Sequence, residues 1–359
     1  KSVLFNWEKE IKKFAPEMKY EIAYGKFDYS VPMDKDTVYL TTYETLGIHD
    51  EYFKDTKYDV IIMDEAHYIK NSRTGRYRSL QRLEAGFMLA LTGTPMENNI
   101  AELWSLLNIL NPNLFGKRSE FLQKFGNLND DKEQMTQLQK MIVPFILRRT
   151  KTQVLPELPA KTEEYVYCKM GEKQRNIYDI LLSAAQNEIE EKPSRYVIKD
   201  NAAILQSLQY LRECCIDPML LKKGMVGSGI SDSCKFDSFK EYAENIMNES
   251  GKLIVFAYYP QSLKRLQTWC KQKNWNTYYI DGEVNDRQRI VDEFEREQQG
   301  VFFISIKAAG VGLNLTSCQY VIIYEPWWNP AVEEQAADRV YRIGQEKPVF
   351  VYHFLVKDT

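Results

Sequence analysis

Two adjacent carboxylates stand in the tetrapeptide Asp64-Glu65-Ala66-His67, directly after the apolar run at residues 58–63. If that run is a strand of an open parallel sheet, its carboxyl end is where such sheets bind ligands. A carboxylate at that place holds Mg²⁺ through its water shell, and a second one beside it orients or deprotonates an attacking water. An acidic turn that caps the next helix has the same residue types, so both interpretations stay open from this segment alone.

Two further segments carry hydroxyl groups or glycines after apolar runs. Leu91-Thr92-Gly93-Thr94-Pro95 marks a second strand end with a tight turn, and Ala309-Gly310-Val311-Gly312-Leu313-Asn314 follows the run at 301–305. Glycines at such positions allow a backbone to approach a phosphate or a nucleic acid closely. Each segment by itself is weak evidence, because ordinary turns have similar sequences.

A pair of arginines, Arg339 and Arg342, lies three residues apart in the segment 335–345. On a helix this spacing places two side chains on one face, so both guanidinium groups would reach one polyphosphate together. A solvated basic face is the other interpretation of the same pair.

The elements that must position these residues form two blocks, in which short β-rich apolar runs alternate with helical patterns, as is typical of parallel α/β units. We expect two α/β lobes with buried strands. Between them, apolar residues recur at helical spacing, which predicts a mostly helical insertion with a proline-containing linker at 155–159. The predicted strands lie at residues 37–41, 58–63 and 87–91, and then at 253–256, 277–280, 301–305, 320–324 and 349–354.

Composition excludes several classes of protein. The chain has 359 residues, of which 27% are charged and 44% hydrophobic, so disordered and low-complexity classes do not fit. A net charge of −3 means that a nucleic-acid site has to be local. No apolar run approaches the ~20 residues of a bilayer span, and no secretory leader is apparent. Six cysteines without a C-x-x-C pair predict reduced thiols and no zinc site, in a cytoplasmic protein or, in a eukaryote, a nuclear one.

Taken in order, these segments resemble the motifs of the Swi/Snf-type ATPases, the double-stranded-DNA translocases of helicase superfamily two. The resemblance covers nearly the whole chain, and the form Ile216-Asp217-Pro218 favours a bacterial member. The matching segments are 4–7 (motif Ia), 41–44 (Ib), 64–67 (II), 91–95 (III), 147–151 with 158–161 (between the lobes), 211–218, 255–256 (IV), 281–282 (IVa), 310–314 with 327–330 (V) and 335–345 (VI).

The resemblance implies an α/β fold with two RecA-like lobes, at 1–112 and 236–359, and helical insertions with the linker at 113–235. ATP would bind between the lobes. The catalytic residues carried over from the family are Asp64 for Mg²⁺, Glu65 for the attacking water, and Arg339 and Arg342 for the γ-phosphate. The residues expected to couple ATP to motion are His67, Thr92, Gly93, Thr94, Gly310, Gly312 and Gln335.

The same resemblance implies a monomer that binds double-stranded DNA, with a DNA-bound protein as a further candidate partner. Contacts would go to the DNA backbone, so binding would not depend on base sequence. The residues expected to make them are Asn6, Trp7, Thr41, Thr42, Lys70, Asn71, Arg148, Arg149, Asn314 and Trp328. Core burial is an equally good explanation of Trp328 from sequence alone.

One departure from the family stands out. The sequence contains no P-loop, G-x-x-x-x-G-K-[ST], whose backbone N–H groups and lysine hold the phosphates of ATP. We therefore expect the chain by itself to be inactive as an ATPase, through truncation of the preceding strand and P-loop. Two alternatives remain: a strand-separating or RNA-directed helicase of the same superfamily, and a non-hydrolysing interaction module.

Overall fold

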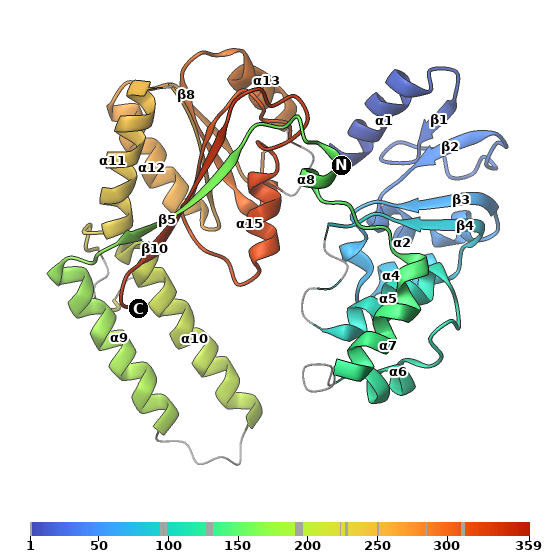
Figure 1. Cartoon of the computed structure of the whole chain (residues 1–359), viewed down its shortest axis with the longest axis horizontal. Helices are drawn as coiled ribbons and strands as arrows, with labels where there is room; N and C mark the ends of the chain where they lie inside the picture. Colours follow the sequence, from blue (N-terminus) through green and yellow to red (C-terminus); the bar gives the residue numbers. More distant parts are fainter. Residues whose placement is uncertain are drawn as a thin grey trace. The chain divides into compact units, whose positions relative to one another are not determined.

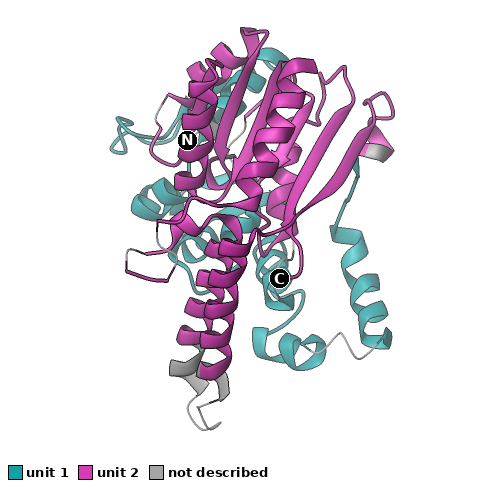
Figure 2. Cartoon of the chain, turned by 90° about the vertical axis from the view of Figure 1, so that its left-hand side faces the viewer, with its two compact units in different colours: residues 1–150 teal, residues 151–359 magenta. Residues whose placement is uncertain are grey.

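The computed structural model describes residues 2–359 except 94–95, 97–98, 127–131, 191–196, 223, 227–228, 250, 285 and 310–312. The chain divides into two compact units, residues 1–150 and 151–359 (Figure 2). The predicted boundaries at 112 and 235 stay a prediction. Within the described ranges, no helix has the length and apolar character needed to cross a membrane.

The first unit contains two short parallel sheets and a set of helices (Figure 1). One sheet pairs β1 (Lys19–Ile22) with β2 (Thr37–Leu40), and the other pairs β3 (Lys57–Met63) with β4 (Glu84–Ala90). The helical elements are α1 (Ser2–Phe14), α2 (Tyr43–Ile48), α3 (Asp50–Lys54), η1 (Ala66–Ile69), α4 (Gly75–Gln81), α5 (Ile100–Leu110), α6 (Arg118–Phe125), α7 (Lys132–Ile142) and η3 (Val143–Phe145).

Polar side chains begin three of these helices. Thr42, Thr74 and Asn99 accept hydrogen bonds from the first turns of α2, α4 and α5, which satisfies backbone N–H groups that lack a partner in the helix. The core of the unit forms where α4 and α5 pack under β3 and β4, around Met63 and Leu106. The helix starts therefore follow from local sequence, and the core from the apolar face of each element.

The expectation that β3 and β4 are buried strands is wrong for one face of their sheet. Four large apolar side chains on that face are exposed: Val60 by 53%, Ile62 by 48%, Phe87 by 59% and Leu89 by 39%. Val60 pairs with Phe87 and Ile62 with Leu89, so the four lie together. The sequence shows an apolar run and predicts burial on both faces, whereas the helices of this unit pack on the opposite face.

The second unit is built on one six-stranded parallel sheet with the strand order β5-β10-β9-β6-β8-β7. All five strands expected in the second block are present, each within two residues of the predicted bounds. The predicted α/β fold class is thus confirmed. The strands are β5 (Lys161–Cys168), β6 (Lys252–Ala257), β7 (Thr277–Ile280), β8 (Gly300–Ser305), β9 (Tyr320–Ile323) and β10 (Val349–Val356).

Helices cover both faces of this sheet (Figure 1). Leu253 and Val255 of β6 face α11 (Cys234–Glu249) and α12 (Pro260–Gln272), whereas Ile254 and Phe256 face α13 (Arg287–Arg296) and α15 (Pro330–Ala337). Every residue of β6 and β8 is buried, because a parallel strand with helices on both faces needs apolar side chains in both directions. The shorter helical elements are α8 (Lys151–Val154), η4 (Pro218–Leu220) and α14 (Ile306–Ala309).

Strand β5 is an element that the sequence analysis did not predict. It pairs with β10 over eight residues, although its polar composition places it inside the expected helical insertion. As the edge strand it keeps Tyr165 and Tyr167 exposed, so it carries no continuous apolar run. The chain then enters the helical hairpin of α9 (Glu172–Glu190) and α10 (Val197–Ile216), which extends away from the sheet (Figures 1 and 2).

Candidate functional site

The acidic pair lies where predicted, at the carboxyl end of β3. Asp64 follows the last residue of the strand, and Leu91 N donates to Met63 O at 2.8 Å while Ala66 N donates to Leu91 O at 2.9 Å. These bonds place the segment after β3 beside the segment after β4. Thr92 and Gly93 therefore stand next to the acidic pair, as the sheet geometry predicts. Thr94 lies outside the described residues.

Both oxygens of the Asp64 side chain are fixed by hydrogen bonds. Oδ1 accepts from the backbone N–H of Glu65 at 2.8 Å, and Oδ2 accepts from the indole N–H of Trp7 at 2.8 Å. Tyr43 donates its hydroxyl to the backbone oxygen of Asp64 at 2.8 Å. Burial, with the charges of Asp64 and Glu65, raises the pKa of Tyr43, which keeps this hydroxyl a donor. Asp64 is thus held in one orientation partly by Trp7 and Tyr43, which are distant from it in the sequence.

Glu65 has an unusual backbone conformation at the point where the strand turns into η1. Its φ of 49° lies in the left-handed region, which side chains other than glycine adopt rarely. Its Oε2 lies 3.2 Å from Nδ1 of His67. His67, which we expect to couple ATP to motion, therefore contacts Glu65, which we expect to act on the attacking water. Strain of this kind concentrates at functional sites, and it favours catalysis over a simple helix cap.

The donor set fits Mg²⁺ in part. Mg²⁺ in proteins uses one or two carboxylates and keeps several waters or substrate phosphates, and the half-buried Asp64 supplies one such oxygen donor. When bound, the ion would neutralise charge on the phosphates of a nucleotide. The residue that would hold it is Asp64, and Trp7 fixes the direction of that side chain.

The residues expected to contact DNA in the first unit differ in their exposure. Asn6, Asn71, Arg148 and Arg149 are exposed. Thr41 and Thr42 are half-buried and already engaged, since Thr41 Oγ1 donates to Ala23 O and Thr42 caps α2. Lys70 is buried, with 8% exposure, and its ammonium lies 3.7 Å from Glu102. Trp7 is half-buried and turned toward Asp64. These DNA roles stay predictions.

In the second unit, the expectation that Arg339 and Arg342 share a helix face is wrong. Helix α15 ends at Ala337, and both arginines follow it in turns. The backbone oxygen of Arg339 accepts from Leu315 N at 3.1 Å, and Nη1 of Arg342 donates to Leu313 O at 3.2 Å. The structure thus ties both arginines to the segment that follows β8. Gln335 is half-buried on α15, whereas Gly310 and Gly312 lie outside the described residues.

Lys151, which the sequence analysis did not single out as functional, anchors the same turn. Its Nζ lies 2.8 Å from Oδ1 of Asp338, donates to Tyr341 O at 2.6 Å and stands 5.6 Å from the centre of the Tyr341 ring. Burial lowers the pKa of Lys151, and the ion pair with Asp338 opposes that shift. The available signal in the sequence was its place in the segment 147–151, which resembles the segment between the lobes in the family.

Trp328 is exposed by 70%, so core burial is not its explanation. It stands beside an aromatic group at the carboxyl ends of β6 and β9, in which the rings of Tyr258 and Trp327 stack at 3.8 Å. The guanidinium of Arg212, from α10, lies 4.4 Å from the ring centre of Trp327 and 5.8 Å from that of Trp328. Asn314, the other residue expected to contact DNA in this unit, is exposed.

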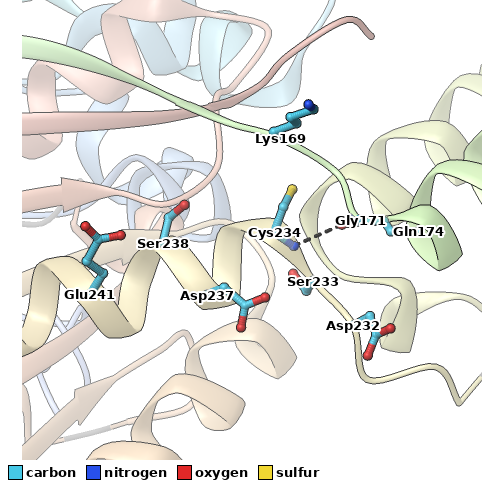
Figure 3. Close-up of a pocket in the computed structure, with 9 residues that line it drawn as sticks. All are labelled: Lys169, Gly171, Gln174, Asp232, Ser233, Cys234, Asp237, Ser238 and Glu241. Atoms are coloured by element: carbon cyan, nitrogen blue, oxygen red, sulfur yellow. Dashed lines mark hydrogen bonds between the residues drawn. The ribbon is translucent and has the colours of Figure 1, made fainter.

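A pocket of about 380 Å³ lies at the start of α11 (Figure 3). Gln174 closes one side of it, accepting from Cys234 N and donating to Cys214 O. The predicted catalytic and DNA-binding residues do not line this pocket. The lining residues are Lys169, Gly171, Gln174, Asp232, Ser233, Cys234, Asp237, Ser238 and Glu241.

Comparison with known proteins identifies the family of the chain. The family model described as "SNF2-related domain" matches residues 1–220, and the model described as "Helicase conserved C-terminal domain" matches residues 235–344. The putative ATP-dependent helicase/translocase YwqA of Bacillus subtilis is 33% identical over 100% of this chain and 40% of its own length. The human SWI/SNF-related matrix-associated actin-dependent regulator of chromatin subfamily A member 1 is 30% identical over 100% of this chain and 36% of its own length.

A solved structure is also similar in sequence. The SWI2/SNF2 ATPase core of Sulfolobus solfataricus, in complex with double-stranded DNA, is 33% identical, covers 99% of this chain and 75% of that chain, and gives a TM-score of 0.47. The chain spans about 40% or less of the length of each of the two curated relatives named above. Because the first family model covers more than half of the 359 residues, the chain belongs to the SNF2 family of helicase-like ATPases.

Proposed function

We propose that this chain is the motor part of an ATP-dependent DNA translocase that moves along an intact duplex. The observation that carries the proposal is the fixed acidic pair Asp64 and Glu65 at the carboxyl ends of β3 and β4, in a chain of the SNF2 family. Relatives described as a helicase/translocase and as a regulator of chromatin support DNA as the track.

Each catalytic residue has its own role in this proposal. Asp64 would hold Mg²⁺, which would neutralise charge on the phosphates, and Glu65 would accept a proton from the attacking water or orient it. Arg339 and Arg342 supply positive charge to the γ-phosphate as it is transferred, a kind of contribution worth ~10³ to 10⁵ in rate where it has been measured. Thr92, Gly93 and His67 lie beside the acidic pair and report the state of the nucleotide to the rest of the first unit.

The DNA contacts proposed are those of exposed polar side chains. Asn6, Asn71, Arg148 and Arg149 in the first unit and Asn314 and Trp328 in the second are accessible to a duplex. They would contact phosphates and sugars, which carry no sequence information. Binding independent of sequence suits a motor that moves along its track.

Replacement of Glu65 by Gln tests the catalytic assignment. Because the sequence has no P-loop, the assay uses a protein that carries this chain together with a P-loop segment, and the 359-residue chain alone is expected to hydrolyse no ATP. An amide accepts no proton from water, so the E65Q variant should bind Mg²⁺–ATP and lose steady-state hydrolysis by ~10²-fold or more.

Replacement of Glu84 by Gln, an exposed carboxylate at the opposite end of the same sheet, is the matched control and should leave turnover unchanged. Full turnover in E65Q would exclude Glu65 as the base. Absence of hydrolysis in the unmodified protein with its P-loop would instead favour a non-hydrolysing interaction module.

A further inference from the structure

A buried carboxylate, Glu325, joins the ends of two neighbouring strands in the second unit. It follows β9 and is fully buried. Its Oε2 accepts hydrogen bonds from the backbone N–H groups of Tyr258 at 2.9 Å and Tyr259 at 3.2 Å, just beyond β6. Oε1 is buried and has no hydrogen-bond partner in the described part of the chain. A carboxylate in this setting costs stability, so packing alone does not explain it.

An arginine holds the same region from the other side. Nη2 of Arg212 donates to the backbone oxygen of Pro326 at 2.9 Å, and its guanidinium covers the Trp327 ring at 4.4 Å. It also lies 5.5 Å from the ring centre of Tyr258, the ring on which Trp327 stacks. One planar group thus contacts both members of the stack and the backbone between β9 and α15. A lysine has no planar group to do the same.

The residues from Pro326 to Asn329 therefore form a turn that is held at several points. Besides the contact of Arg212, the backbone N–H of Trp327 donates to Oε1 of Glu333 at 2.5 Å, and the Asn329 side chain caps α15. Trp328 is the residue of this turn whose ring faces solvent, with 70% exposure. The anchors fix the backbone on both sides of an exposed indole.

We propose that Glu325 and Arg212 are positioning residues that hold this turn so that Trp328 is presented to DNA. The inference rests on the proposed function, in which Trp328 contacts the duplex. Glu325 fixes the turn to the end of β6, and Arg212 fixes it to α10. Presenting an ordered indole lowers the entropy lost on binding, so loosening either anchor weakens binding without removing a contact.

Protonation of Glu325 makes the positioning depend on pH. Burial raises the pKa of Glu325 to about 7, although the Ser262 hydroxyl, Lys235 and the two backbone N–H groups oppose the shift. A carboxylate accepts hydrogen bonds about twice as strong as those of a neutral carboxyl, so the turn is held more firmly above pH ~7 than below it. Duplex affinity should therefore rise as pH increases from 6 to 8.

The effect on folding has the opposite sign. The pKa of Glu325 in the fold lies above its ordinary value of 4.5, so its contribution to stability is full below that value and is lost as pH rises through about 7. A Gln at this position removes the buried charge. At pH 8 the E325Q variant should thus unfold at the same temperature as the wild type or a higher one.

Other titratable groups also face this region and have to be separated from Glu325. Lys235 donates to Tyr324 O and Phe354 O, and His353 lies 3.2 Å from the Glu333 carboxylate that binds Trp327 N–H. All of them remain in E325Q, so any pH dependence left in that variant belongs to them. The groups, by element, are Arg212 (α10), Lys235 (α11), Tyr258 and Tyr259 (between β6 and α12), Lys307 (α14, 4.5 Å from the ring centre of Tyr258), Tyr324 (after β9), Glu333 (α15) and His353 (β10).

The experiment measures the affinity of the chain for a mixed-sequence duplex at pH 6, 7 and 8 in wild type, E325Q and R212K. Arg175→Lys is the matched control, because Arg175 also donates to backbone oxygens, of Lys357 and Asp358, and lies 5.3 Å from the ring centre of Tyr178. Labelling with 5-fluorotryptophan, with Trp327→Phe and Trp328→Phe for assignment, reports the order of the turn.

We expect E325Q and R212K each to bind duplex about 3- to 10-fold more weakly at pH 8, with E325Q losing the pH dependence of the wild type. The fluorine signals of Trp327 and Trp328 should shift or broaden in both variants and stay unchanged in R175K. Wild-type affinity in E325Q and R212K, or a pH dependence unchanged by E325Q, would overturn the proposal.

Trp328→Ala separates failure of this inference from failure of the proposed function. If duplex binding is weakened by W328A but not by E325Q or R212K, Trp328 contacts DNA and the positioning role is wrong. If W328A binds DNA as the wild type does, the DNA contact itself is wrong, and the positioning role for DNA falls with it.

Discussion

At the scale of residues, the carboxylate of Asp64 shows what local sequence can and cannot predict. The acidic pair is recognisable because polar residues directly follow an apolar run. Trp7, which fixes Oδ2 of Asp64, is 57 residues away and was expected at DNA instead. Contacts between distant segments depend on how the chain packs. A sequence motif can therefore identify the reacting side chain, but it does not identify the side chains that orient it.

The arginine pair gives a prediction at this scale. Arg339→Ala and Arg342→Ala should each lower kcat by ~10³-fold or more in a protein that includes the P-loop, because under the proposed function each removes charge that acts on the transferred phosphate. Duplex binding without nucleotide should persist. Steady-state hydrolysis and equilibrium DNA binding, measured on the same preparations, check the two halves of the statement.

Arg296→Ala is a suitable control, since Arg296 is exposed in the last turn of α13. It should change neither quantity. Silent changes at both Arg339 and Arg342 would mean that the pair is a solvated basic surface. Loss of DNA binding with normal kcat would mean that the two arginines belong to the DNA-binding surface and not to the ATP site.

At the scale of elements, five of the six strands of the second unit were predictable, whereas β5 and the end of α15 were not. Strands β6 and β8 are continuous apolar runs, which is what burial on both faces requires. Edge strand β5 has no such run, and α15 ends before the arginines although their spacing suits a helix. The spacing of apolar residues indicates which side chains are buried. It therefore does not reveal a polar edge strand, and it does not show where a helix ends if the residues after it keep helical spacing.

The contact between α8 and the turn after α15 yields the prediction at this scale. Lys151→Met removes the ion pair with Asp338 and the hydrogen bond to Tyr341 O while keeping most of the aliphatic stem. The turn that carries Arg339 and Arg342 would then be less well placed, and misplacement of about 1 Å costs up to ~10²-fold in rate. In a protein that includes the P-loop, single-turnover hydrolysis should slow at least tenfold, with duplex affinity unchanged.

Lys173→Met is the control for the loss of a lysine, because Lys173 is exposed and lies 3.6 Å from Asp232. A K151M protein with wild-type single-turnover rates would show that the turn holds its place without Lys151. A fall in duplex affinity of the same size would assign Lys151 to the DNA side instead.

At the scale of the whole molecule, the net charge and the exposed polar side chains favour a local DNA-binding surface over a general affinity for nucleic acid. The net charge is −3, so binding depends on where the exposed polar side chains stand. Such residues occur in both units, from Asn6 to Trp328. Two units that grip the same backbone in turn would advance a motor without opening the duplex.

Triplex displacement tests this central claim most directly. A protein that carries the chain with a P-loop is given ATP and a duplex bearing a third strand, beside a plain forked duplex and an RNA duplex. We predict ATP-dependent release of the third strand, no strand separation of the fork, and greater stimulation of hydrolysis by DNA than by RNA. Efficient unwinding of the fork, or a preference for RNA, would contradict the account.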